Sequence, residues 1–245
     1  MQKPIDFHDG VRGQTLKWFV MDTPDRAHWD KEGDTIEYRF NQDGFRMDIE
    51  MDEVEKGCDI YIGDSTTLSF GLNLEDGWAY KHFVQTEQKN QFVNLSQASC
   101  GLDTITRLLG YWVPVLEPEN VWLLEPAPNR QEFMDSDGVG WSSAVWHQIV
   151  VQKLGGKEIT DQSYFLEKLF LEHVSLDPQV EVQKAKNLDA IQWICRDTNL
   201  HYADHSPFEW YGGSRDGYHP GADQQNKILD RFVRVEISSP LPSTW

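Results

Sequence analysis

The chain has 245 residues, enough for one large domain or two modest ones, and carries 40 acidic against 22 basic side chains. Its formal charge of −18 at pH 7 repels nucleic-acid backbones and anionic membrane surfaces, so direct nucleic-acid binding is disfavoured and no membrane contact is expected. The sequence also lacks an apolar run of about 18 residues and the pattern of an N-terminal leader. We therefore expect a cytoplasmic protein.

Alternating apolar residues predict a β-hairpin between Thr35 and Met51. Apolar and polar side chains alternate over 36–40 and again over 45–51. The segment Asn-Gln-Asp-Gly at 41–44 lies between the two runs and is typical of a turn. This hairpin is the most specific local structure that the sequence predicts.

The solvent face of the second predicted strand is acidic. Asp48, Glu50 and Asp52 would stand about 6.6 Å apart along it, because a strand rises about 3.3 Å per residue. Glu53 and Glu55 extend this acidic row. Like charges at such a spacing repel one another, so the row either faces open water or binds a cationic partner. These five residues are the predicted partner-binding site.

Short strands are predicted through the rest of the first hundred residues. Apolar runs or strict alternation mark the segments 15–21, 59–62, 68–74, 78–84 and 92–95. Turns rich in Asp and Gly separate several of them. Such a series predicts an antiparallel β-meander, either a curved sheet or a partly closed barrel.

Helical patterns dominate the rest of the chain. The spacing of the apolar residues over 102–109 predicts a short helix, and four prolines make 111–128 an irregular crossing segment. Later helical patterns lie at 141–149, 165–174 and 177–195, and a final strand is predicted at 228–237.

The order of strands, then helices, then a final strand predicts an α+β fold, because the alternating βαβ units of a doubly wound sheet are missing. We expect an N-terminal antiparallel β-meander, a three-helix C-terminal part and one closing strand. The whole chain, 1–245, is predicted to be a single domain. It could divide into a β-rich half, 1–98, and a mainly helical half, 99–245, with a long aromatic loop at 199–226.

A candidate metal site lies near the end of the third predicted helix. Asp197, His201 and His205 are each four residues apart, so they would share one face if that helix continued to Ser206. His219 could complete the shell of a divalent metal from the loop that follows. The simpler interpretation is that His201 caps the helix carbonyls, and a metal-free polar pocket is the third.

Other catalytic patterns are missing from the sequence. It contains no phosphate-binding glycine motif, no dinucleotide fingerprint and no Gly-x-Ser-x-Gly. Three distant cysteines indicate neither a disulfide framework nor a zinc ribbon. Cys195 and a distant histidine could meet in space, but a lone cysteine on an apolar helical stripe is more typical of a core. No residue is therefore assigned a catalytic role, and no cofactor beyond a divalent metal is expected.

Three hypotheses of function follow. The favoured one is an acidic interaction module, not an enzyme, that binds and blocks a basic protein partner in the manner of an immunity protein or an inhibitor imitating nucleic acid. The first alternative is a metal-dependent hydrolase or lyase with a His/Asp site at 197–219. The second is a structural subunit of a larger assembly, to which the aromatic residues would contribute contacts. The oligomeric state is left open.

Overall fold

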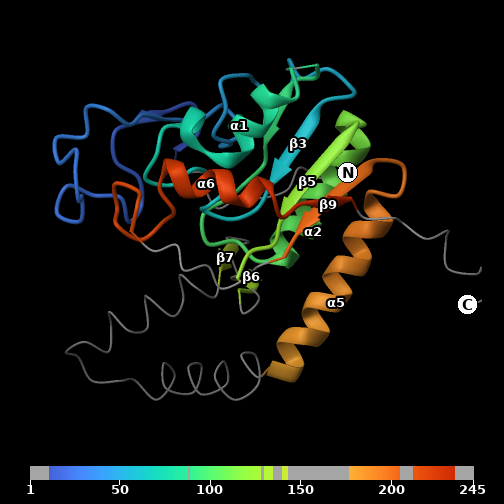
Figure 1. Ribbon diagram of the computed structural model, residues 1–245. Helices are drawn as coiled ribbons and strands as arrows, with labels where there is room; N and C mark the ends of the chain where they lie inside the picture. The colour runs from blue at the N-terminus through green and yellow to red at the C-terminus, as the bar shows by residue number, and fades with distance from the viewer. Residues whose placement is uncertain are drawn as a thin grey trace, which may run out of the picture.

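A five-stranded sheet forms the centre of the protein (Figure 1). The computed structural model describes residues 11–87, 89–127, 130–134, 140–142, 177–204 and 212–234. The strands lie in the order β4 (Phe92–Asn94), β3 (Asp59–Ile62), β5 (Asn120–Leu124), β8 (Asn199–Ala203) and β9 (Val233–Arg234). The first four are parallel, and β9 pairs with β8 in the antiparallel direction.

Helices cover both faces of this sheet. The chain runs from β3 through α1 (Trp78–Gln85) to β4, and from β4 through α2 (Leu102–Leu116) to β5. The helix α5 (Asp177–Ile194) precedes β8, and α6 (Ala222–Leu229) precedes β9. In Figure 1, α1 and α6 lie together on one side of the sheet, and α2 and α5 lie on the other. The result is a three-layer α/β arrangement.

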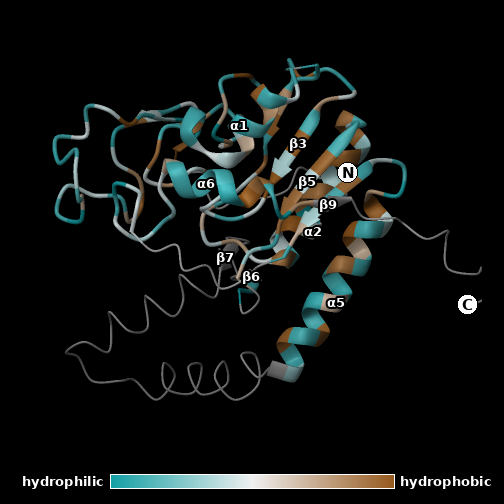
Figure 2. Cartoon of the chain, in the orientation of Figure 1, coloured by the Kyte–Doolittle hydropathy of each residue, from teal (hydrophilic) through white to brown (hydrophobic). Residues whose placement is uncertain are grey.

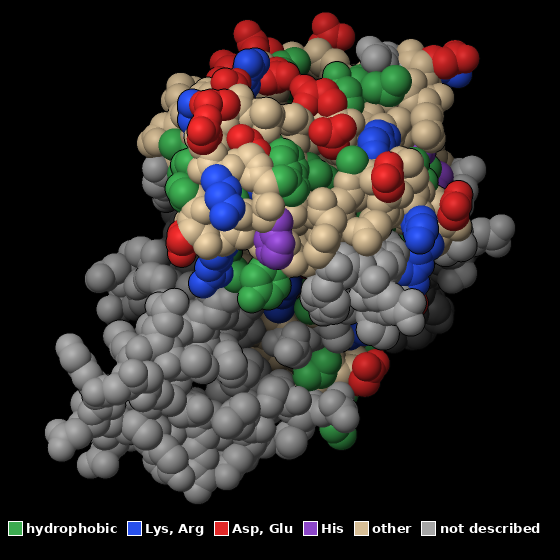
Figure 3. Space-filling model, turned by 60° about the vertical axis from the view of Figure 1, so that its left-hand side comes forward, with side chains coloured by type: hydrophobic (Ala, Val, Ile, Leu, Met, Phe, Trp, Pro, Cys, Tyr) green, Lys and Arg blue, Asp and Glu red, His purple; other side chains and the backbone are tan. Residues whose placement is uncertain are grey.

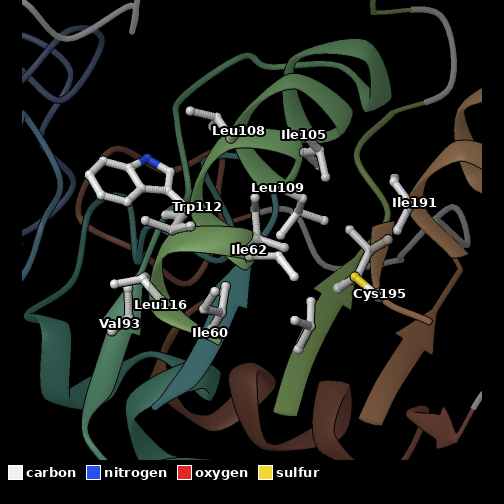
Figure 4. Packing of buried hydrophobic residues seen from close by; sticks show 14 of the residues in the cluster. Ile60, Ile62, Val93, Ile105, Leu108, Leu109, Trp112, Leu116, Ile191 and Cys195 are labelled. Atoms are coloured by element: carbon white, nitrogen blue, oxygen red, sulfur yellow. The ribbon is translucent and has the colours of Figure 1, made fainter. Parts of the chain in front are cut away.

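Successive residues of each strand point to opposite layers. Ile60 and Ile62 of β3 face α2, where they contact the apolar stripe that includes Leu109 (Figure 4). Tyr61, between them, faces the other layer and packs near Trp78 of α1. Because both faces are covered, all four residues of β3 are buried. In Figure 2, brown stretches lie among paler ones along the central strands, and many outer loops are teal.

The N-terminal segment forms a third, smaller cluster beside the sheet. Its two short strands, β1 (Thr15–Leu16) and β2 (Tyr38–Arg39), pair in the antiparallel direction. The cluster joins this segment to the turn that follows β3 and contains Phe19, Ile36, Tyr38, Phe40, Leu68 and Phe70. A separate antiparallel pair consists of β6 (Glu132–Met134) and β7 (Gly140–Ser142).

The predicted α+β fold with an N-terminal β-meander is wrong. The main sheet is parallel, and helices connect its strands. Residues 78–84, predicted as a strand, belong to α1, in which Trp78, Ala79 and Phe83 share the buried face. Residues 68–74 also form no strand; they make a turn whose sides are both buried, so their alternating hydropathy reflects burial around a bend.

The predicted hairpin at 35–51 is also wrong. Its first strand is reduced to β2, and residues 45–52 form turns. The cause is Arg46, whose guanidinium is buried and donates hydrogen bonds to main-chain carbonyls of Glu37, Leu68, Ser69 and Leu72. A guanidinium that is buried away from water needs these hydrogen-bond acceptors. The main chain around Arg46 bends toward the 68–72 turn, because only then does the side chain reach them.

Other boundaries differ as well. The segment predicted to be irregular, 111–128, contains the end of α2 and the whole of β5. The third predicted helix is confirmed as α5, but it ends at Ile194, and β8 begins at Asn199. The strands predicted at 59–62 and 92–95 are confirmed as β3 and β4. Within the described residues, no helix is both long and apolar enough to cross a bilayer.

The contact between α2 and the sheet predicts which substitutions weaken the fold. Leu109→Ala should lower the free energy of unfolding by about 2–5 kcal/mol, because it leaves a cavity in the core. Val115→Ala on the same helix is the matched control, because that side chain is 48% exposed and its loss should change stability by less than about 0.5 kcal/mol. Urea denaturation followed by circular dichroism measures both. Equal losses in the two variants would contradict the packing described.

Candidate active site

The sheet has one position where its connections diverge. From β3 the chain passes to β4 on one side, and from β5 it leads to β8 on the other. Because β3 and β5 are neighbouring parallel strands, their carboxyl ends lie side by side at the same edge of the sheet. Open α/β sheets bind ligands at such a point. The residues directly after β3 are therefore the first place to look for a site.

A tight turn follows β3 and carries a serine. We call residues 63–71 the serine turn. A side chain at Gly63 would lie 2.2 Å from Thr67 Oγ1 and 2.9 Å from the Leu124 carbonyl oxygen, so only glycine fits there. The N–H groups of Leu68 and Phe70 then donate to the carbonyls of Asp64 and Ser65, both at 3.0 Å.

These bonds close a single helical turn whose N-terminal end holds Ser65. That residue is 6% exposed. The Asp64 side chain accepts the Thr66 N–H at 2.9 Å and pairs with Arg130, which fixes the main chain on either side of the serine.

A second loop brings a histidine to this serine. We call residues 212–219 the histidine loop. Its last residue, His219, places Nε2 2.8 Å from Ser65 Oγ and Nδ1 2.6 Å from Asp216 Oδ2. An ionised carboxylate can only accept, so Nδ1 carries the ring proton and Nε2 is free to accept the Ser65 hydroxyl proton. The arrangement is a nucleophile, a base and an orienting acid in one line.

The orienting carboxylate is held from several directions. Its Oδ1 accepts the Ser214 hydroxyl and the N–H groups of Tyr218, at 3.1 Å, and His219, at 3.2 Å. Burial opposes ionisation of Asp216, but the hydrogen bond and charge attraction from His219, together with those donors, lower its pKa to about 2. Phe70 of the serine turn packs on the His219 ring, with centroids 4.8 Å apart.

Hydrogen-bond donors lie near the serine turn. The Gly63 carbonyl accepts the Gln97 N–H and the Cys100 thiol, each at 3.2 Å, so the segment leading into α2 touches the serine turn. The N-terminal end of α2 carries the partial positive charge of the helix dipole. Within the described part of the chain, no acceptor is recorded for the Ser65 backbone N–H. The site therefore joins a hydroxyl to an imidazole, and the segment that leads into α2 lies against the serine turn.

The five predicted partner-binding residues do not form a regular row. Asp48 lies 3.7 Å from Arg39, Glu50 accepts the Gln42 N–H at 2.8 Å, and Glu53 accepts the Glu50 N–H at 3.2 Å. Asp52, in a turn, and Glu55, in an irregular segment, are both exposed. Figure 3 likewise shows acidic side chains spread over the face in view and interspersed with lysine and arginine.

The candidate metal ligands are distributed over different elements. Asp197 is exposed and lies 3.5 Å from Arg196, whereas His201 is in β8, with its ring stacked on Trp122 at 3.7 Å. His219 belongs to the histidine loop, and His205 lies outside the described residues. Among the residues that the structure describes, no group of three or more His, Cys, Asp or Glu is placed to hold a metal ion.

Cys195 is also placed away from the serine turn. The residue is fully buried in the cluster between α2, α5 and the sheet. Burial raises the pKa of its thiol to about 12, so the reactive thiolate is scarce at neutral pH.

The sequence analysis missed Ser65 as a nucleophile and Asp216 as the acid that orients His219. A weak signal was present: Ser65 follows the buried strand 59–62 after a glycine, and Asp216 and His219 are three residues apart. The Gly-x-Ser-x-Gly search could not detect it, because this serine lies in a turn with a different glycine spacing.

Similarity to known proteins is found among solved structures. No protein-family model matches the sequence, and no curated protein matches it. Solved structures that are similar to it include TesA, with 15% identity and a TM-score of 0.35 over 71% of this chain and 94% of that one. The psychrotrophic esterase EstA from Pseudoalteromonas sp. has 17% identity and a TM-score of 0.34, over 71% and 93%. The family 3 carbohydrate esterase of Clostridium thermocellum has 14% identity and a TM-score of 0.34, over 71% and 92%.

The hypothesis of an immunity protein or inhibitor is therefore wrong. It depended on carboxylates held at regular intervals along a strand, and residues 45–52 form no strand. The fold instead assembles Ser65, His219 and Asp216 at the carboxyl edge of the sheet. What the fold builds at this edge is a hydroxyl, an imidazole and a carboxylate joined by two hydrogen bonds.

Proposed function

We propose that this protein is a serine hydrolase that cleaves acyl esters. The observation that carries the proposal is the chain of two hydrogen bonds that links Ser65 Oγ to His219 Nε2, at 2.8 Å, and His219 Nδ1 to Asp216 Oδ2, at 2.6 Å. These distances lie within the range in which a base takes a proton from a nucleophile.

The first half of the reaction acylates the serine. Ser65 Oγ attacks the ester carbonyl carbon while its proton passes to His219 Nε2, and the carbonyl π electrons move to oxygen. The resulting imidazolium is stabilised by the ionised Asp216. The tetrahedral intermediate then collapses: the bond to the leaving alkoxide breaks, and His219 returns its proton to that oxygen. An alcohol departs, and the acyl group stays on Ser65.

The second half repeats these steps with water. His219 Nε2 removes a proton from a water molecule as its oxygen attacks the acyl carbon. Collapse of the second tetrahedral intermediate expels Ser65 Oγ, which regains a proton from His219. A carboxylic acid is released, and the enzyme returns to its starting state.

Negative charge develops on the carbonyl oxygen in both halves. The Ser65 backbone N–H and the partial positive charge at the start of α2 supply electrostatic stabilisation at this edge of the sheet. Their contribution grows when the substrate excludes water, because the local dielectric constant falls. The cytoplasmic location expected from the sequence stays a prediction.

Removal of the nucleophile is the first test of this function. Ser65→Ala should lower kcat for p-nitrophenyl acetate or butyrate by at least about 10³-fold, because acylation needs the hydroxyl. Ser96→Ala is the matched control: that hydroxyl is also buried but has no hydrogen-bond partner in the described structure. Release of p-nitrophenol measures both. Full activity in Ser65→Ala would refute the proposed nucleophile.

The pH dependence tests the role of the acid. Because the pKa of Asp216 is lowered to about 2, that carboxylate stays ionised above about pH 4, and its stabilising hydrogen bonds are lost only as the pH approaches 2. Above about pH 4, the plot of log kcat/KM against pH should therefore have an acid-side slope no steeper than about 1. A slope of about 2 in that range would show that Asp216 titrates there and would contradict its assignment as an ionised acid.

The orienting acid has its own variant. Asp216→Asn should lower kcat by about 10⁴-fold, because an amide in this position no longer selects the ring tautomer with its proton on Nδ1. Asp204→Asn is the control, since Asp204 is an exposed carboxylate that pairs with Arg231 outside the site. Steady-state ester hydrolysis at neutral pH compares them. Similar kcat values for Asp216→Asn and the control would remove Asp216 from the mechanism.

A further inference from the structure

The N-terminal segment lies outside the central sheet yet packs against the histidine loop. Residues 15–40 form their own two-stranded pair, and Figure 1 shows this blue segment beside the red loop that precedes α6. Direct contacts join the two: the His28 N–H donates to the Arg215 carbonyl at 2.8 Å. Almost two hundred residues of sequence separate some of these partners, so the contact is one that only the fold creates.

Arg215 makes the strongest of these contacts and is fully buried. Its Nε donates to both carboxylate oxygens of Asp22, at 3.0 and 3.1 Å, and Nη1 donates to Asp30 at 3.0 Å. Nη2 donates to Asp22 and to the Lys17 carbonyl. The guanidinium also lies over the Trp18 ring, 4.0 Å from its centroid. Every nitrogen of the Arg215 guanidinium thus donates a hydrogen bond, and all of the acceptors belong to the N-terminal segment.

The same carboxylate also holds the serine turn. Asp22 Oδ2 accepts the Tyr38 hydroxyl at 2.6 Å, and the oxygen of that hydroxyl accepts the Gly71 N–H at 2.8 Å. The Gly71 carbonyl in turn accepts the Arg215 N–H at 2.9 Å. A closed ring of contacts therefore runs from Asp22 through Tyr38 and Gly71 to Arg215 and back.

This ring joins the two segments that supply the proposed catalytic groups. Gly71 is the last residue of the serine turn, and Arg215 is the neighbour of Asp216 in the chain. Gly71 has φ +71°, and a side chain there would lie 2.9 Å from Ser214 Cβ and 3.2 Å from Asp216 Oδ1. The two segments touch so closely that a shift in one must displace the other.

We infer that Asp22 and Arg215 are positioning residues, whose buried ion pair sets the distance between Ser65 and His219. This role rests on the proposed hydrolase function. Neither residue contacts the reacting atoms. Each holds the main chain of one of the two segments, and together they keep Oγ within reach of Nε2. The N-terminal segment is therefore part of the catalytic apparatus.

Kinetics of four variants test this inference. Arg215→Met and Asp22→Asn should each lower kcat by about 10- to 100-fold and change KM by less than about threefold, because a displaced base slows chemistry without removing substrate contacts. Arg215→Lys should recover part of kcat, since it keeps the charge but not the fork. Arg39→Met is the matched control, because that arginine is exposed and pairs with Glu37 and Asp48. Unchanged kcat in Arg215→Met and Asp22→Asn would overturn the inference.

A double variant separates positioning from stability. Asp22→Asn combined with Arg215→Met removes both charges of the Asp22–Arg215 pair and leaves only Asp30 without its arginine, so its free energy of unfolding should recover in part toward that of the wild type. Its kcat should stay low, because the ring of contacts is still broken. Recovery of kcat together with stability would show a purely structural role.

A second combination tests whether Arg215 and Asp216 act through the same histidine. In an Asp216→Asn background, Arg215→Met should lower kcat by less than about a further threefold, because the orientation of His219 is already lost.

Proton NMR tests the geometry without relying on activity. A histidine Nδ1–H that donates to a carboxylate gives a signal at low field, and Asp216→Asn assigns it to His219. The signal should weaken or move in Arg215→Met and stay in place in Arg39→Met. An identical signal in Arg215→Met and the wild type would overturn the inference even if the wild type hydrolyses no ester. Absence of ester hydrolysis in the wild type, with the signal lost in Arg215→Met, would count against the proposed function alone.

Discussion

β3 and β5 pair in parallel, with Asp59 beside Asn120 and Ile62 beside Leu123, and this register determines where the chain can place reacting groups. Both strands end at the same edge, where their connections leave in opposite directions, and open α/β sheets bind ligands at such a point. Gly63 allows the chain to bend at that edge because no other residue fits between Thr67 and the Leu124 carbonyl. The helical turn that follows presents Ser65 at its N-terminal end. The apolar contacts of β3 with α1 and α2 thus stabilise the fold and also fix the nucleophile.

Charge is used differently inside the protein and on its surface. The excess of carboxylates is mostly solvent-exposed and interspersed with cations, as Figure 3 shows for one face, and contributes to long-range repulsion more than to any site. Three of the buried charged side chains each connect segments that are distant in sequence or orient a site residue. Arg46 holds the 68–72 turn through main-chain carbonyls, Arg215 joins the N-terminal segment to the histidine loop, and Asp216 orients His219. Removing one member of such a group lowers the free energy of unfolding by more than its hydrogen bonds contribute, because its partner is left charged and desolvated. These buried groups therefore tie distant segments to the serine turn.

Local pattern was enough to predict β3, β4 and α5, because each has an apolar run or a capped periodic stripe that tertiary contacts do not override. The pattern failed over 68–74 and 78–84, where burial on two sides made a turn and a helix look like strands. The pattern also failed for the acidic row. The chain bends there because Arg46 donates to main-chain carbonyls at 68–72, and the local sequence does not show these acceptors. For the site, His219 was singled out from its neighbours in sequence but with metal ligation as its role. Its true partner, Ser65, is 154 residues away, and only the order of strands in the sheet brings the two together.

The most direct test is the covalent reaction of the serine with a fluorophosphonate, read by intact mass and peptide mapping. Ser65 attacks phosphorus as it would attack an ester carbonyl, and fluoride leaves. The account predicts one adduct per chain, on the peptide that contains Ser65, formed slowly in His219→Ala and absent in Ser65→Ala. An unmodified wild-type protein, or an adduct that persists in Ser65→Ala at the same rate, would contradict it.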